Sequence, residues 1–159
     1  MRVIVGIDPG SYELGIAFLS EEGKLVYSEM IKSPANKSRI VRISYIKGKV
    51  RSLFRRAVLK REFGGEVKDV FYEEPHARNA KTAKVLSEVI GSIVSDIYEN
   101  FKIEAKPIDA VKARKALGLG KKASKEDVKK KICELIGQDS LSQHEVDAIL
   151  IALGGEKCS

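Results

Sequence analysis

The chain has 159 residues, of which 43% are hydrophobic and 32% charged, with a formal net charge of +7. This composition excludes a disordered chain, and the length fits one domain, residues 1–159, with its own core. Two cysteines are too few for a disulfide framework, no apolar run approaches the roughly 20 residues that span a membrane, and no signal-peptide pattern is present. We therefore expect an intracellular protein that has no membrane partner.

The first part of the chain predicts three strands. Residues 3–8 (VIVGID) form an apolar, partly β-branched run, and the Pro-Gly after Asp8 is typical of a turn. Residues 14–19 and 24–31 flank the turn-like sequence SEEGK, which predicts a hairpin. These strands are expected to pair antiparallel.

The rest of the chain alternates between helices and strands. Apolar residues recur with helical spacing between residues 37 and 63, and the run 67–73 (VKDVFYE) predicts a fourth strand. The pattern then predicts a helix from Asn79 to about Asn100, a short strand within 102–108, and helices over 109–117, 124–136 and 142–153. This order indicates an α/β domain on a mixed five-stranded sheet, three antiparallel strands and then two parallel ones, with helices on both faces.

The positive charge is concentrated in two segments. Residues 37–63 contain ten Lys or Arg and one acid, and residues 102–131 contain eleven Lys or Arg and four acids. A single charge run is most simply a solvated helix face. Two runs from which acids are depleted favour a surface for a polyanion such as nucleic acid.

Two carboxylates mark the ends of predicted strands. Asp8 ends the first strand and Glu73 ends the fourth. If a crossover makes these strands parallel neighbours, both carboxylates reach the same edge of the sheet. Taken separately, Asp8 also fits a turn former, and Glu73 or Glu74 fits a surface acid.

The last helix adds two more polar side chains. His144 and Asp147 are three residues apart and share one helical face, away from the apolar stripe of Val146, Ile149, Leu150 and Leu153. Ser142 and Glu145 fit a capping box, which explains Glu145 structurally. Clustered carboxylates repel one another unless a cation lies between them, and oxygen ligands with one imidazole suit Mg²⁺ or Mn²⁺. A divalent metal site would explain an acid in such an apolar helix.

These residues match a known family. The stretches IVGIDPGSYELGIAFL, VFYEEPHARNAKTAKVL, GLGKKASKEDVKKKI and HEVDAILIAL resemble, in order, the motifs of the RuvC Holliday junction resolvases, whose fold is that of RNase H. The resemblance implies an endodeoxyribonuclease that cuts four-way DNA junctions in recombination and repair. It also implies two Mg²⁺ ions per site, which Mn²⁺ can replace, and a homodimer with two active sites.

By this resemblance, Asp8, Glu73, His144 and Asp147 form the catalytic and metal-binding set, with His144 either a ligand or a proton-transfer group. The same resemblance places the DNA contacts on Lys112, Lys121, Lys122, Lys125, Arg78 and His76, and implies work at the nucleoid. A branch-migration helicase partner is possible for such an enzyme, but no feature of the sequence identifies one.

The segment after Glu73 departs from the family pattern. It reads Glu74-Pro75-His76, where the family usually has apolar or aromatic residues. His76 and Tyr72 are the candidates for a wedge at the junction centre, although Tyr72 fits better as a core aromatic. Another nuclease of RNase H-like fold, either an RNase H or a YqgF-like RNA-processing enzyme, is the alternative function.

Overall fold

The computed structural model describes residues 1–63, 65–75 and 79–159. One mixed sheet has the strand order β3-β2-β1-β4-β5. β1 pairs antiparallel with β2 and parallel with β4, and β5 continues the parallel part. The predicted sheet is therefore confirmed. The strands are β1 (Arg2–Asp8), β2 (Glu13–Ser20), β3 (Leu25–Lys32), β4 (Glu66–Glu73) and β5 (Lys106–Ile108).

The helices begin where the sequence predicts them. Asn79, Asp109, Ser124 and Ser142 each accept a hydrogen bond from a backbone N–H of the helix that follows, which satisfies groups with no partner inside the helix. Ser142 and Glu145 form the predicted capping box. The helices are α1 (Arg39–Val58), α2 (Ala80–Phe101), α3 (Ala110–Ala116), α4 (Lys125–Ile136) and α5 (Gln143–Cys158).

The fifth strand is shorter than the stretch in which it was predicted. Lys102 takes a left-handed conformation at the end of α2, so the residues up to Ala105 lead the chain back to the sheet. Only three residues then pair with β4.

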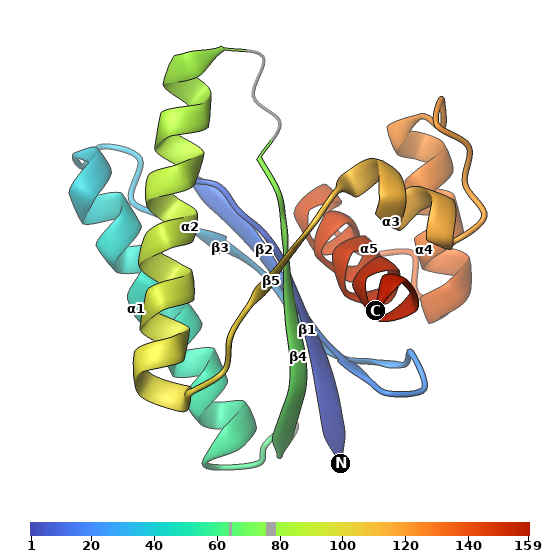
Figure 1. The fold of residues 1–159 in the computed structure, drawn as a ribbon, viewed down its shortest axis with the longest axis horizontal. Coiled ribbons are helices and arrows are strands. Elements are labelled where there is room, and N and C mark those ends of the chain that lie inside the picture. The colour runs from blue at the N-terminus through green and yellow to red at the C-terminus, as the bar shows by residue number, and fades with distance from the viewer. Residues whose placement is uncertain (64, 76–78) are drawn as a thin grey trace.

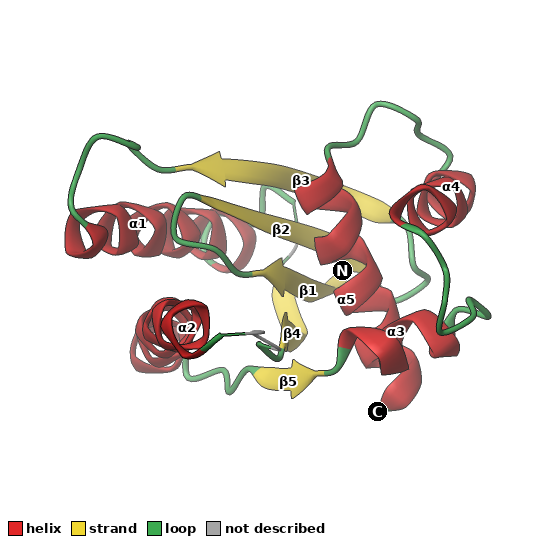
Figure 2. Ribbon diagram, turned by 90° about the horizontal axis from the view of Figure 1, so that it is seen from above, coloured by secondary structure: helices red, strands yellow, loops and turns green. Residues whose placement is uncertain are grey.

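The sheet separates two hydrophobic cores. One core lies between the sheet and the helices α1 and α2, and the other lies between the sheet and α3, α4 and α5 (Figures 1 and 2). The two basic segments of the sequence consequently lie on opposite sides of the sheet, one in α1 and the other around α3 and α4. They do not form one continuous helical surface.

Several arginines of α1 have acidic partners. The guanidinium of Arg51 forms two hydrogen bonds with Asp96 of α2, one of them at 2.9 Å. Ion pairs of this kind hold α1 against α2 and its own C-terminal loop, so part of the charge in this helix is structural. The other pairs join Arg39 to Glu88 and Arg56 to Glu62.

Helix α5 packs unusually close to the sheet. A side chain at Gly6 would overlap the backbone of Ala148, and one at Gly155 would overlap the ring of Phe71. On its other side, α5 is covered by α3, where Gly154 lies against Ala113. The expectation of a single apolar stripe on this helix was therefore too narrow, because the helix lies between two layers and residues all round it are buried.

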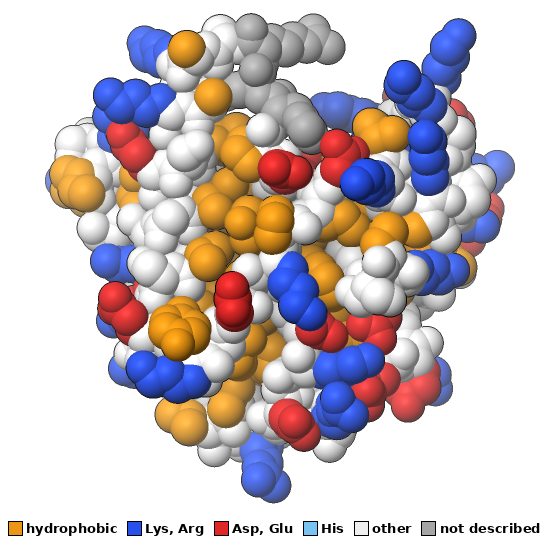
Figure 3. Space-filling view, in the orientation of Figure 1, with side chains coloured by type: hydrophobic (Ala, Val, Ile, Leu, Met, Phe, Trp, Pro, Cys, Tyr) orange, Lys and Arg blue, Asp and Glu red, His pale blue; other side chains and the backbone are white. Residues whose placement is uncertain are grey.

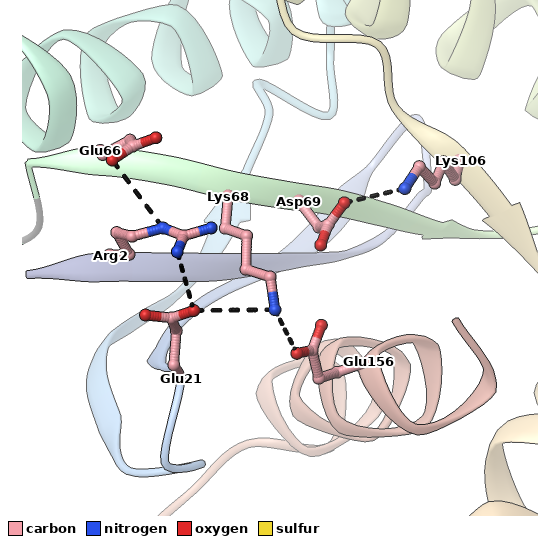
Figure 4. Close-up of polar contacts among 7 residues, drawn as sticks. All are labelled: Arg2, Glu21, Glu66, Lys68, Asp69, Lys106 and Glu156. Atoms are coloured by element: carbon pink, nitrogen blue, oxygen red, sulfur yellow. Dashed lines mark hydrogen bonds and ion pairs between the residues drawn. The ribbon is translucent and has the colours of Figure 1, made fainter.

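Ion pairs connect the end of α5 to the sheet. Lys68 of β4 lies 2.7 Å from Glu156 of α5 and 3.6 Å from Glu21 in the hairpin turn between β2 and β3 (Figure 4). Arg2 joins Glu21 to Glu66, and Lys106 pairs with Asp69. Half-exposed pairs of this kind contribute about 0–1 kcal/mol each. In the described residues, no helix is long and apolar enough to cross a membrane.

Candidate active site

The acids at the ends of β1 and β4 lie on the α5 side of the sheet. Side chains alternate between the two faces of a strand, so Asp8 shares a face with Ile4, and Glu73 shares one with Phe71, both of which belong to the α5 core. Asp8 is buried, with 8% of its surface exposed, and Glu73 is half-buried. Side-chain hydrogen bonding links the two carboxyl groups.

Helix α5 brings the other two predicted residues to this edge. Nδ1 of His144 lies 3.0 Å from Oδ2 of Asp8. Asp147 follows one turn later and accepts a 3.0 Å hydrogen bond from Nε2 of Gln143. The negative charge of Asp147 contributes to the raised pKa of Glu73. The four residues that the sequence singled out are thus assembled at one place.

Glu13 is a fifth residue of this polar cluster, and the sequence analysis did not identify it. Its Oε2 lies 2.9 Å from Nε2 of His144, so the imidazole is held between two carboxylates. Glu13 begins β2 on the same face as Gly15, which pairs with Asp8. That alternation, combined with the hairpin register, was the signal that could have identified it.

The protonation of this cluster follows from its burial and its charges. The pKa of Glu73 is raised to about 8, first by burial and then by the nearby carboxyl groups of Asp8 and Asp147. The positive charge of Arg114 opposes this rise. Burial and then Asp8 also raise the pKa of Asp147, which is opposed by Gln143, His144 and Lys125. The hydrogen bond that His144 donates to Asp8 is the main cause of the raised pKa of His144, with a contribution from Glu13. Only a doubly protonated ring can donate to both carboxylates.

The donor set fits a hard divalent cation. It consists of carboxylate oxygens and one imidazole. Burial, and after it the charge of Asp8, raises the pKa of Glu73 and of Asp147, and a cation between these acids would offset both effects. Within the described ranges, no three His, Cys, Asp or Glu side chains are already arranged around an ion position. In this arrangement the raised pKa of Glu73 and the contacts of His144 with Asp8 and Glu13 offset part of the repulsion among the acids.

A hollow adjoins the acids between α3, α4 and α5. Its volume is about 270 Å³, and Glu73 and Asp147 form part of its wall. Arg114 from α3 and Lys125 from α4 line it as well, above apolar side chains such as Leu150. An anionic group that entered this hollow would meet two cations beside the acid cluster.

The other predicted DNA contacts that the structure describes do not line this hollow. Lys121 and Lys122 are exposed in the loop that leads to α4. Lys112 is exposed on α3, where its carbonyl oxygen faces the thiol of Cys158 at the end of α5, and it does not line the hollow. His76 and Arg78 lie outside the described residues.

The structure also distinguishes Glu73 from its neighbour Glu74 and shows where the side chain of Tyr72 packs. Glu74 is exposed, and its backbone N–H donates a 2.9 Å hydrogen bond to the carbonyl oxygen of Ile108, so Glu73 alone faces the cluster. Tyr72 is half-buried against the core on the α1 and α2 side. This confirms Tyr72 as a core aromatic.

The outer side of α2 is open and largely apolar. A shallow hollow there is lined by Ile90, Gly91, Val94 and Tyr98 together with Tyr72. Figure 3 shows apolar side chains gathered over α2 and the neighbouring edge of the sheet. Gly91 is exposed, and a side chain placed on it would meet nothing within 4 Å. Its small size is therefore not required by packing within this chain.

Comparisons with known proteins agree with this arrangement. A family model described as crossover junction endodeoxyribonuclease RuvC matches residues 4–154. The structure of Thermus thermophilus RuvC is similar with a TM-score of 0.80 and 23% identity, over 98% of this chain and 93% of that one. The structure of T. thermophilus RuvC in complex with Holliday junction substrate is similar with a TM-score of 0.80 and 22% identity, over 99% of this chain and 94% of that one. The likeness confirms the RNase H-like fold, and no curated protein matches.

Proposed function

The chain belongs to the RuvC family of crossover junction endodeoxyribonucleases, and we propose that it resolves four-way DNA junctions by hydrolysing phosphodiesters at the edge of the sheet. The observation that carries this proposal is the contact of Asp8 with both Glu73 and His144, which come from distant parts of the chain. A buried group of acids is costly unless it serves a cation or a reaction. As an enzyme of DNA, the protein would work inside the cell, at the nucleoid.

We propose Mg²⁺ as the cofactor, with two ions per site and Mn²⁺ as a substitute. Asp8, Glu73 and Asp147 are the residues that would hold the ions, because their oxygens are the ligands that Mg²⁺ prefers. When bound, the ions would activate the attacking water and stabilise the departing 3′-oxygen. The protein keeps these carboxylates together and half-shielded from water, so that a cation is strongly favoured among them.

His144 has a defined orientation in this scheme. Glu13 accepts a hydrogen bond from Nε2–H, which leaves Nδ1 directed at Asp8. A histidine whose other ring nitrogen is bound by a carboxylate is fixed in tautomer and in ring angle. His144 could therefore bind a cation or move a proton through Nδ1, while Glu13 acts as a positioning residue.

The DNA would approach along the side of the sheet that carries α3, α4 and α5. Lys121, Lys122 and Lys125 lie there around the hollow and its loop, and they would contact phosphates without reading bases. Lys112 would lie farther along the same side. Family resemblance adds His76 and Arg78 to the proposed contacts, on the segment that follows Glu73.

We propose further that the active form is a homodimer. Cutting two opposed strands of a junction requires two sites related by a twofold axis. The open face of α2 supplies a suitable surface, because its apolar side chains are uncovered and the exposed Gly91 and Ser87 would let a partner helix approach closely. The mass in solution, compared with that of a Gly91→Lys variant, tests this assignment.

Cleavage of defined substrates tests the function as a whole. The protein is incubated with a synthetic four-way junction, a linear duplex and an RNA–DNA hybrid, each with and without Mg²⁺, and the nicks are mapped. We expect paired, symmetric nicks in the junction that depend on Mg²⁺. A preference for the hybrid would instead establish the alternative, an RNase H or a YqgF-like enzyme.

A further inference from the structure

Among the described residues, no hydrogen bond or ion pair explains the position of the Arg114 side chain. Its side chain is half-buried on α3, and its Nε is fully buried without a hydrogen-bond partner among the described residues. Its positive charge acts to lower the pKa of the Glu73 carboxyl group. Buried polar groups are normally hydrogen-bonded, so a guanidinium left without a partner calls for a ligand or a role in chemistry.

Another arginine shows what a structural role looks like in this protein. Nε of Arg42 is also buried without a partner, but Nη1 of Arg42 donates a 2.8 Å hydrogen bond to the carbonyl oxygen of Lys37. The guanidinium of Arg42 also lies over the ring of Tyr12, 4.0 Å from its centroid. Within the part of the chain that the structure describes, Arg114 has neither kind of contact, so its guanidinium is available to a ligand.

The surroundings of Arg114 are those of a phosphate site. Arg114 and Lys125 line the same hollow from two different helices, and Glu73 and Asp147 stand in its wall. A phosphodiester must approach these acids to be cut, and the acids alone would repel it. A guanidinium presents a planar fork of N–H groups that matches two oxygens of a phosphate.

Position in the helix does not account for Arg114. It lies in the last turn of α3, where a cation interacts favourably with the helix dipole. Lys115 lies in the same turn, is exposed, and supplies this interaction without entering the hollow. Lys115 therefore serves as the matched control for every measurement on Arg114.

We propose that Arg114 is a catalytic residue that binds the scissile phosphodiester of the DNA strand in the hollow between α3, α4 and α5. It stabilises the charge that builds on the phosphate oxygens as the bond to the 3′-oxygen breaks. Lys125 faces the same phosphate group as a second cation. This inference rests on the proposed nuclease function, because it assigns a role within the same site.

Single-turnover cleavage of a four-way junction tests the proposal. Arg114→Gln is expected to lower the cleavage rate by about 100-fold, the usual loss when one donor to a developing charge is removed. Its dissociation constant for the junction, measured without Mg²⁺, should stay within about threefold of the wild-type value. Arg114→Lys should recover part of the rate, and Lys115→Gln should leave both quantities unchanged.

A modified junction locates the contact. A methylphosphonate replaces one charged oxygen at the cleavage position, or at the next phosphate along in the control. If Arg114 binds the scissile group, the modification at that position should slow the wild-type enzyme far more than Arg114→Gln. Equal slowing of both proteins would overturn the proposal, as would a greatly weakened Kd with an unchanged single-turnover rate.

Stability separates catalysis from folding. Arg114→Gln should melt at the temperature of the wild-type protein or above it, since no described side chain forms a hydrogen bond or an ion pair with the guanidinium. A variant that unfolds, or melts well below Lys115→Gln, would show that the fold needs Arg114 and would overturn the proposal. A wild-type protein that does not nick junctions would instead refute the nuclease function itself.

Discussion

The backbone of His144 lies directly against Gly15, the residue that pairs with Asp8 across the sheet. A Cβ at position 15 would overlap the carbonyl oxygen of His144. Because Gly15 has no side chain, α5 can approach the strands closely enough for Nδ1 of His144 to lie 3.0 Å from Oδ2 of Asp8. The geometry of the acid cluster therefore depends on a glycine that performs no chemistry.

Gly15→Ala should displace the start of α5. We expect the free energy of unfolding to fall by about 1–3 kcal/mol, as is usual when a group is added to a packed core, and junction cleavage to fall with it. Gly48→Ala is the control, because Gly48 lies inside α1 with nothing within 4 Å of an added Cβ. That change should stabilise the protein by about 0.5–1 kcal/mol. Chemical denaturation measures both, and an unaffected Gly15→Ala protein would contradict the packing argument.

Removal of single charges should separate cutting from binding. Asp8→Asn and Asp147→Asn keep the size of each side chain but weaken the hold on a cation. Cleavage should be lost by at least about 100-fold, while the junction is bound as well as before or better, because repulsion of the phosphates is reduced. Gel shift and nicking assays on the same samples test this. Cleavage that survives either change would remove that residue from the site.

Metal binding should release a proton below about pH 8. The pKa of Glu73, raised to about 8 by burial and by Asp8, means that this carboxyl is protonated at neutral pH when no metal is present. Apparent affinity for Mg²⁺ should therefore increase with pH and level off above about 8. Calorimetry in two buffers with different ionisation enthalpies counts the protons. Glu73→Gln should reduce this release, and a wild-type protein that releases no proton would contradict the raised pKa of Glu73.

The same group makes the metal-free protein less stable at higher pH. In the unfolded chain, the carboxyl of Glu73 has the ordinary pKa of 4.5, so between about pH 4.5 and 8 only the folded state holds the proton. The free energy of unfolding contributed by Glu73 is then complete below this window and falls as pH rises through it. Glu73→Gln should flatten the fall, which thermal melts at several pH values can detect.

Glu13 should influence the titration of His144. The pKa of His144 is raised, first by the hydrogen bond to Asp8 and to a smaller extent by Glu13. Glu13→Gln should lower that pKa, and Asp8→Asn should lower it further. NMR titration of the imidazole signals measures the shift directly. Because the folded pKa is raised, the stabilisation due to His144 is present at low pH and is lost as pH rises through the folded value.

Three lysines should contribute to the salt dependence of junction binding. Replacement of Lys121, Lys122 and Lys125 by Ala should reduce the slope of log K against log salt by roughly 0.9 for each lysine that contacts a phosphate. The control replaces Lys47, Arg55 and Lys60 of the α1 region, on the opposite side of the sheet. Anisotropy titrations at several salt concentrations give both slopes. Equal slopes for the two triple variants would show that α1 binds the junction equally.

Local signals identified much of this protein. The alternation and the β-branched runs predicted the strands, and caps such as Asn79 and Ser142 predicted where helices start, because these features depend on residues close together in the chain. The parallel pairing of β1 with β4 followed from a crossover of sufficient length. From that pairing, the meeting of Asp8 with Glu73 could be predicted as well.

Long-range packing decided the rest. Glu13 reaches His144 only because the hairpin register and the close approach of α5 at Gly15 combine. Arg114 enters the hollow beside Glu73 because α3 packs over α5, a contact that no local pattern encodes. By itself, the sequence determined the elements and the four residues of the predicted active site. Which further side chains surround those four was set by the tertiary structure, since contacts between distant segments depend on how whole elements pack against one another.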